Sequence, residues 1–133
     1  QLLGEQSNRA VEAAMGPARA FVYAAHEDFG IAPVEAQACG TPVIAFGRGG
    51  TAETVCDPRT SSHDGTGILF PEQTVAALVT AVEDFERLEP QFSRERIHQH
   101  ARSFSAEVFR DRYQGFVDRA WAAFLQGDRL TSL

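Results

Sequence analysis

The sequence predicts an α/β fold, with a Rossmann-like parallel sheet and helices on both faces. Residues 20–25 form a short apolar run with β-branched and aromatic members, which is typical of a buried strand. A turn at Gly30 leads into a predicted helix of about ten residues, and Pro42 breaks the chain before a second apolar run from Val43 to Phe46. These segments make a βαβ unit, whose ligand crevice lies beyond the carboxyl ends of its strands.

The turn before the helix is suited to an anion or to a set of hydroxyls. Gly30 has no Cβ, so it can adopt a backbone conformation that is closed to other residues and let a ligand come close. Pro33 suits the first helical turn, where its missing N–H would have had no partner. The amides of Gly30, Ile31 and Ala32 are then free, and the helix dipole adds roughly half a positive charge at that end.

Two carboxylates flank this turn. Glu27 falls at the end of the strand, and Glu35 follows eight positions later, where we expect it to reach toward the same mouth. An ionised carboxylate accepts from two hydroxyls at once, which suits the ribose diol for Glu35 and a hexopyranose for Glu27. The alternative is that both are ordinary acidic residues favoured near a helix N-terminus, and the spacing taken alone favours this alternative.

The residues around the two carboxylates change this balance, because they resemble a known family. The segment from Glu27 to Glu35 closely resembles the E-x7-E signature of retaining GT-B glycosyltransferases of family 4 (group 1), and residues 40–45 resemble its Gly-Thr-Pro-Val-Ile-Ala closure. The resemblance continues at Leu3-Gly4, similar to the end of a strand, at residues 49–55, similar to a Gly-Gly-x-x-Glu loop, and at residues 65–70, similar to the next strand. The variants that it resembles most are bacterial mannosyltransferases of O-antigen or capsule assembly, which points to GDP-mannose.

The resemblance implies a role for each matching residue. Glu27 would be the catalytic residue, contacting the hexose hydroxyls of the donor and organising the transferring centre. The amides of Phe29, Gly30 and Ile31 would hold sugar hydroxyls or the distal phosphate, Val34 would lie along the nucleoside, and Glu35 would take the ribose diol. The implied donor-binding residues are Gln6, at the base edge, with Phe29, Gly30, Ile31, Val34, Glu35, Gly49 and Gly50.

The resemblance also implies what the chain does not contain. Family members clamp the diphosphate with an Arg and a Lys from upstream strands, whereas all twelve basic side chains here are arginines and both clamp positions would fall before residue 1. The acceptor-binding N-terminal domain would lie upstream too. We therefore expect residues 1–133 to be a partial donor-binding domain ending in C-terminal helices, and to be inactive in isolation. A glycan or lipid-linked acceptor, and any peripheral membrane contact, would belong to the full-length protein.

Composition excludes several other classes of function. The net charge of −6 and the interleaving of arginines with acidic residues argue against a nucleic-acid surface. No apolar run approaches the roughly 20 residues that cross a bilayer, so we expect a cytoplasmic protein, with the full-length form reaching the inner membrane face. Cys39 and Cys56 match no metal-site or disulfide spacing, and we expect neither a metal nor a cofactor besides the nucleoside diphosphate sugar.

The rest of the chain is predicted to be architectural. Thr74 is an expected N-cap of a helix that ends at Pro90, and Ser93 is an expected cap of the next helix. One face of the first of these helices is predicted to carry Val75, Leu78, Val79, Val82 and Phe85. From Ile97 to Phe124 apolar residues recur at helical spacing, which predicts one or two amphipathic helices.

Two functions from other classes stay open on the sequence. The first is a non-catalytic module that binds or senses a nucleotide sugar, favoured if the chain binds donor without turnover. The second is a doubly wound interaction domain without a ligand, favoured if replacing Glu27 and Glu35 changes only stability.

Overall fold

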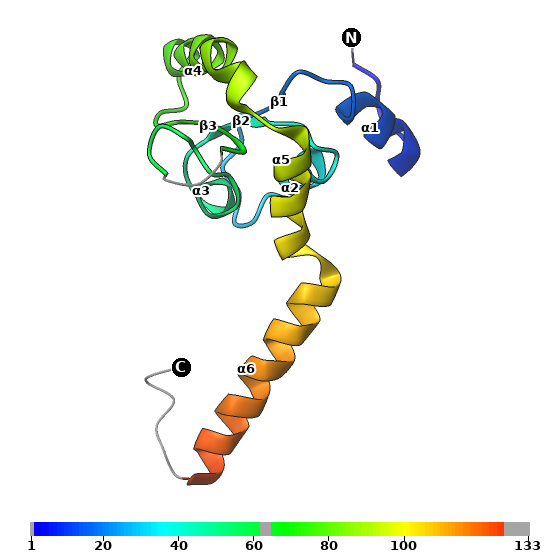
Figure 1. Cartoon of the computed structure of the whole chain (residues 1–133), viewed down its shortest axis with the longest axis vertical. Coiled ribbons are helices and arrows are strands. Elements are labelled where there is room, and N and C mark those ends of the chain that lie inside the picture. Colours follow the sequence, from blue (N-terminus) through cyan, green and yellow to red (C-terminus); the bar gives the residue numbers. More distant parts are fainter. Residues whose placement is uncertain (1, 62–64, 127–133) are drawn as a thin grey trace. The chain divides into compact units, whose positions relative to one another are not determined.

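The computed structural model describes residues 2–61 and 65–126. The chain divides into two compact units, Gln1–Ala101 and Arg102–Leu133. The elements of the first unit are, in order, α1 (Asn8–Met15), β1 (Phe21–Tyr23), α2 (Ile31–Ala38), β2 (Val43–Phe46), α3 (Gly50–Thr54), β3 (Gly67–Phe70), α4 (Val75–Leu88), the 3-10 turn η1 (Glu89–Gln91) and α5 (Arg94–Ala101) (Figure 1).

The three strands form a parallel sheet in the order β1-β2-β3. The register pairs Val22 of β1 with Ile44 of β2, and Ile44 with Ile68 of β3. Every residue of the central strand β2 is buried, as a continuous apolar run in a parallel sheet requires. The predicted Rossmann-like parallel sheet is therefore confirmed.

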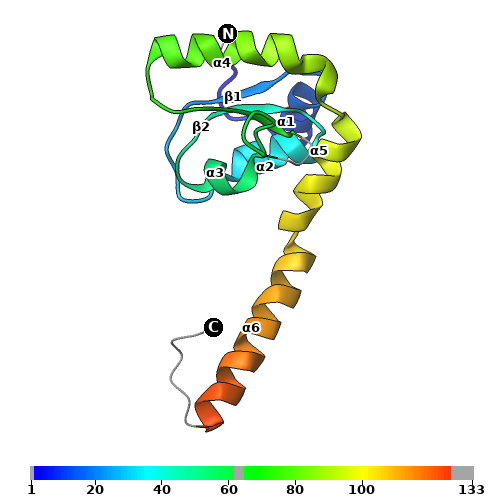
Figure 2. The same cartoon turned by 60° about the vertical axis from the view of Figure 1, so that its left-hand side comes forward.

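Helices cover both faces of this sheet, because side chains alternate along each strand. One buried cluster joins β2 and β3 to α4 and contains Ile44, Phe46, Ile68, Phe70, Ala81 and Phe85. A second cluster lies on the opposite face against α2 and contains Ala36, Val43, Ala45 and Val55. Figure 2 shows α4 on one side of the sheet and α2 and α3 on the other. The predicted placement of helices on both faces is confirmed.

The cap of α4 is as predicted, whereas its predicted apolar face is wrong at two positions. The Thr74 hydroxyl accepts from the N–H of Ala77 at 3.2 Å. Val75 and Val79 are 80% and 49% exposed. The face toward the sheet is the stripe of residues 78, 81, 82 and 85, in which small Ala81 lets the helix approach closely. Val79 lies about 100° around the helix from residue 78, and Val75 is the first residue of α4.

Leu3-Gly4, which the resemblance likens to a strand end, is not in a strand. Within residues 2–61 and 65–126 the sheet consists of β1, β2 and β3 alone. Gly4 has a positive φ of 64°, a left-handed conformation that extended strands do not adopt. Leu3 is exposed and finds no strand to pair with in the part of the chain described.

The second unit contains the 3-10 turn η2 (Arg102–Phe104) and the long helix α6 (Ala106–Gln126). With α5, these elements confirm the prediction of helices between Ile97 and Phe124. Aromatic rings stack along α6, with centroids 5.7 Å apart in the pair Phe109–Tyr113 and 5.6 Å apart in the pair Trp121–Phe124. No helix in the described ranges is both long and apolar enough to cross a membrane.

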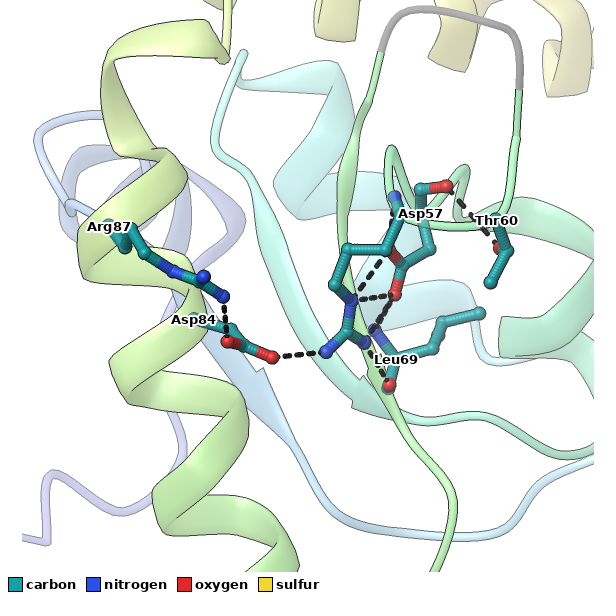
Figure 3. Close-up of polar contacts among 6 residues, drawn as sticks. Asp57, Thr60, Leu69, Asp84 and Arg87 are labelled. Carbon is teal, nitrogen blue, oxygen red and sulfur yellow. Dashed lines mark hydrogen bonds and ion pairs between the residues drawn. The ribbon is translucent and has the colours of Figure 1, made fainter.

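A buried carboxylate fastens the loop before β3 to the sheet and to α4 (Figure 3). The side chain of Asp57 is 2% exposed and accepts from the Arg59 guanidinium and from the N–H of Leu69 at 2.8 Å. Arg59 also donates to the Leu69 carbonyl and pairs with Asp84 of α4, which pairs with Arg87. The network thus joins the loop before β3, the strand β3 and the helix α4.

Candidate functional site

The loop between β1 and α2 presents an uncapped helix N-terminus. Gly30 is the N-cap of α2 and has φ 77° and ψ 73°, the left-handed conformation predicted for the turn. No side chain caps this end of the helix, and its first turn contains no acidic residue. The amides of the first turn, including those of Ile31 and Ala32, are therefore not used by a capping side chain.

The same loop is held in place by the start of α3. Glu27 forms a parallel β-bridge with Gly49, and the N–H of Gly50 donates to the Glu27 carbonyl at 2.9 Å. A Cβ at position 49 would lie 2.2 Å from the Glu27 carbonyl oxygen, and one at position 50 would lie 2.1 Å from that of Phe29. Gly49 and Gly50, predicted to bind the donor, thus pack directly against the backbone of the Glu27 loop.

The short helix α3 is itself anchored to the end of β2 by threonine hydroxyls. The buried hydroxyl of Thr51 donates to the carbonyl of Phe46 and lies 3.0 Å from that of Arg48. Thr54 donates within the helix to the Gly50 carbonyl at 2.9 Å. The sequence pattern did not identify Thr51 as a support of the site, because a buried threonine becomes recognisable only once the strand end and the helix meet.

Two open hollows lie beside α2. The first, which we call the Glu27 hollow, has a volume of about 590 Å³ and is lined by Tyr23, His26, Glu27, Asp28, Phe29, Gly30, Ile31 and Ala32. The second, which we call the Glu35 hollow, has a volume of about 420 Å³ and is lined by Asn8, Val11, Glu12, Met15, Glu35, Ala38 and Cys39. Each hollow falls within the size range of small-molecule sites.

The structure places the two signature carboxylates in different hollows. We expected Glu35 to reach toward the mouth that holds Glu27, but Glu35 lies on the second turn of α2 and lines the hollow between α2 and α1. Val34 is half-buried on the same helix. Gln6 lies before α1, where its side-chain amide donates to the Leu3 carbonyl at 2.6 Å.

Tyr23, His26 and Asp28 line the Glu27 hollow and were not among the predicted site residues. The imidazole of His26 makes an edge-to-face contact with Phe46, with ring centroids 5.9 Å apart. A hydrogen bond with Glu27, followed by burial and the charge of Glu27, raises the pKa of the Tyr23 phenol above its ordinary value. One feature of the sequence could have identified Tyr23: it is an aromatic residue with a polar hydroxyl at the carboxyl end of a predicted strand, where ligands bind in this class of fold.

The chemistry of the site suits hydroxyl groups and an anion. Glu27 and Asp28 bring acceptor oxygens to one hollow, and the first turn of α2 offers N–H donors and the positive end of the helix dipole. Across residues 2–61 and 65–126, no group of three or more histidine, cysteine or acidic side chains is arranged to hold a metal ion. The arrangement can bind a ligand that carries both hydroxyl groups and negative charge.

The chain is similar in sequence to proteins whose names describe glycosyl transfer. The chain is 36% identical over 99 residues to a D-inositol 3-phosphate glycosyltransferase of Mycobacteroides abscessus, covering 74% of this chain and 21% of that protein. It is 34% identical over 113 residues to an alpha-1,3/1,6-mannosyltransferase of Kluyveromyces lactis, covering 80% of this chain and 22% of that protein. The chain thus spans about a fifth of the length of these relatives.

A solved structure and a family profile agree with these relatives. The fold is similar to that of sucrose-phosphate synthase from Thermosynechococcus elongatus, with a TM-score of 0.71 and 26% identity over 92% of this chain and 30% of that one. The profile of the family described as "Glycosyl transferases group 1" matches residues 1–104, which include both hollows and their lining residues. The chain therefore belongs to the group 1 glycosyltransferase family.

Proposed function

We propose that this chain is the donor-binding part of a retaining GT-B glycosyltransferase of family 4. The full-length protein would transfer a hexose from a nucleoside diphosphate sugar to a hydroxyl of a glycan or lipid-linked acceptor. The observation that carries the proposal is the position of α2 between two hollows, each lined by one carboxylate of the signature. One extended ligand with a sugar at each end and a diphosphate between them matches this arrangement.

In this proposal the hexose occupies the Glu27 hollow and the nucleoside occupies the Glu35 hollow. A carboxylate can accept two hydroxyl hydrogen bonds, so Glu27 would orient the hexose and Glu35 would bind the ribose diol. Apolar surface in the Glu35 hollow, from Val11 and Met15, would contact the nucleoside. Glu27 would position the sugar and would not attack it.

The diphosphate would lie at the N-terminus of α2. Uncapped amides and the helix dipole favour a phosphate there and would stabilise the charge that develops on the leaving diphosphate. Retention of the anomeric configuration would follow if that phosphate assists deprotonation of the acceptor on the same face of the sugar. The cations that complete the clamp would come from segments outside residues 1–133.

GDP-mannose is the first donor to test. The similarity to a mannosyltransferase over 80% of this chain supports mannose. The similarity to D-inositol 3-phosphate glycosyltransferases supports glycosyl transfer without naming mannose, so UDP-glucose and ADP-glucose are the comparison donors.

The test is an NMR titration of the nitrogen-labelled chain with GDP-mannose, UDP-glucose, ADP-glucose and GDP. We expect shifts of the Gly30, Ile31 and Ala32 amides with at least one sugar nucleotide, and weaker binding in Glu35→Ala. Glu83→Ala is the matched control, because it removes the same charge from an exposed position of α4, on the other face of the sheet. A folded chain whose spectrum is unchanged by all four compounds would overturn the proposal.

A further inference from the structure

We propose that Tyr23 is a positioning residue that holds the carboxylate of Glu27 in place for the donor hexose. This inference rests on the proposed function, because it concerns the same hollow. It assigns a role to a residue outside the segment that matches the signature, which begins at Glu27.

The ring of Tyr23 is held by its surroundings. Tyr23 is the last residue of β1 and pairs with Ala45 of the buried strand β2. Its ring stacks on that of Phe21, with centroids 6.1 Å apart, and packs against the buried cluster beneath α2. A half-buried ring fixed on two sides can hold its hydroxyl at one place, with little side-chain entropy left to lose.

The backbone of Glu27 is fixed, whereas its side chain is open to solvent. Its carbonyl accepts from Gly50 and its backbone bridges to Gly49. The carboxylate is exposed at the edge of the hollow, and within the described ranges no arginine or histidine lies close enough to form a salt bridge with it. Tyr23 lines the same hollow from four residues upstream and supplies an O–H donor.

A hydrogen bond from the Tyr23 hydroxyl would leave part of the Glu27 carboxylate available. A carboxylate has about four acceptor positions, so one bond to a phenol still permits two bonds to sugar hydroxyls. A carboxylate held in one rotamer loses less conformational freedom when the hexose arrives. We therefore expect Tyr23 to affect binding of the hexose and to leave binding of the nucleoside diphosphate unchanged.

The first experiment measures the contact itself by NMR of carbon-labelled tyrosine during a titration. The chain has two tyrosines, so Tyr113→Phe leaves Tyr23 as the single phenol. The titratable neighbours of this phenol in the hollow are His26, Glu27 and Asp28. We expect Tyr23 to titrate above the ordinary range of a tyrosine, and Glu27→Ala to lower its pKa. An unchanged Tyr23 titration in Glu27→Ala would overturn the contact.

The second experiment compares GDP-mannose with GDP in wild type, Tyr23→Phe and the control Tyr113→Phe. Tyr23→Phe keeps the ring and removes the hydroxyl, so we expect the affinity for GDP-mannose to fall roughly threefold to tenfold while that for GDP is unchanged. Tyr113→Phe should change neither. Equal loss for both compounds, or no loss for either, would overturn the positioning role. A wild type that binds neither compound would overturn the donor site, whereas the tyrosine titration would still report whether Tyr23 contacts Glu27.

Discussion

Gly50 supports the site by the absence of a side chain. The backbone of Phe29 fills the space that a Cβ at position 50 would need. Such a Cβ would lie 2.1 Å from the Phe29 carbonyl oxygen. Gly50→Ala should therefore displace the loop that carries Glu27 and lower the free energy of unfolding by about 1 to 3 kcal/mol, as overpacking does. Urea unfolding measures the loss, and amide shifts of residues 27–30 report the displacement.

Gly115 provides the matched glycine control. It lies inside α6, where an added Cβ meets only the far end of the Arg119 side chain at 3.4 Å. Gly115→Ala should increase the helix content of α6 and stabilise that helix by about 0.5 to 1 kcal/mol. If Gly50→Ala were as stable as wild type with an unchanged loop, the close approach of α3 to the Glu27 loop would be contradicted.

Asp57 should make the stability of the chain depend on pH. Burial raises the pKa of its carboxyl, but hydrogen bonds from Arg59 and from the backbone N–H of Leu69 outweigh burial and hold this pKa below its ordinary value. A lowered pKa contributes stability that is present above the unfolded-state pKa and is lost as pH falls through the folded-state value. Asp57→Asn should cost about 1.5 to 3 kcal/mol near pH 7.

Urea unfolding of wild type and Asp57→Asn across the acidic range tests this expectation. The difference between the two proteins should shrink as pH falls, because the wild type loses the contribution that the variant never had. A difference that stays constant from neutral pH to strongly acidic pH would show that the charge of Asp57 is not what stabilises the loop.

At the scale of the element, α4 offers a direct comparison of a buried and an exposed apolar residue on one helix. Phe85 is 3% exposed and Val75 is 80% exposed. Phe85→Ala should cost about 3 to 5 kcal/mol, whereas Val75→Ala should change stability by less than about 0.5 kcal/mol. Thermal and urea unfolding of the two variants give the comparison, and comparable losses would mean that α4 packs through the face first expected from the sequence.

The elements that could be predicted are those whose cause is local. The apolar run at Val43–Phe46, the break at Pro42 and the conformational freedom of Gly30 act within a few residues, and the structure has the expected strand and turn there. Whether Leu3-Gly4 forms a strand could not be predicted from nearby residues, because a strand needs a neighbouring strand to pair with. The apolar face of α4 depends on where the sheet lies, which periodicity leaves open.

The motif from Glu27 to Glu35 predicted where the loop and the helix lie, but not which contacts support them. The signature from Glu27 to Glu35 identified the loop and the helix because it is continuous in sequence. Thr51 donates to the end of β2, and the Glu35 hollow forms between α1 and α2, so that the two carboxylates line different hollows; no spacing rule reports either arrangement. These are the features for which the structure adds most to the sequence.

At the scale of the whole molecule, the chain corresponds to about a fifth of the length of its relatives. It covers 21% and 22% of two relatives whose names describe glycosyl transfer. The second unit carries exposed aromatic residues along α6, including Tyr113 and Trp121. The family match itself lies within residues 1–104.

The measurement that tests the central claim most directly is saturation-transfer NMR on GDP-mannose with two single variants. Transfer to ribose and transfer to hexose protons are read separately, so each hollow has its own signal. We predict that Glu27→Ala reduces transfer to the hexose and preserves it to the ribose, that Glu35→Ala does the reverse, and that Glu83→Ala resembles wild type. Equal signals from all four folded proteins, or none from the wild type, would contradict a donor site divided between the two hollows.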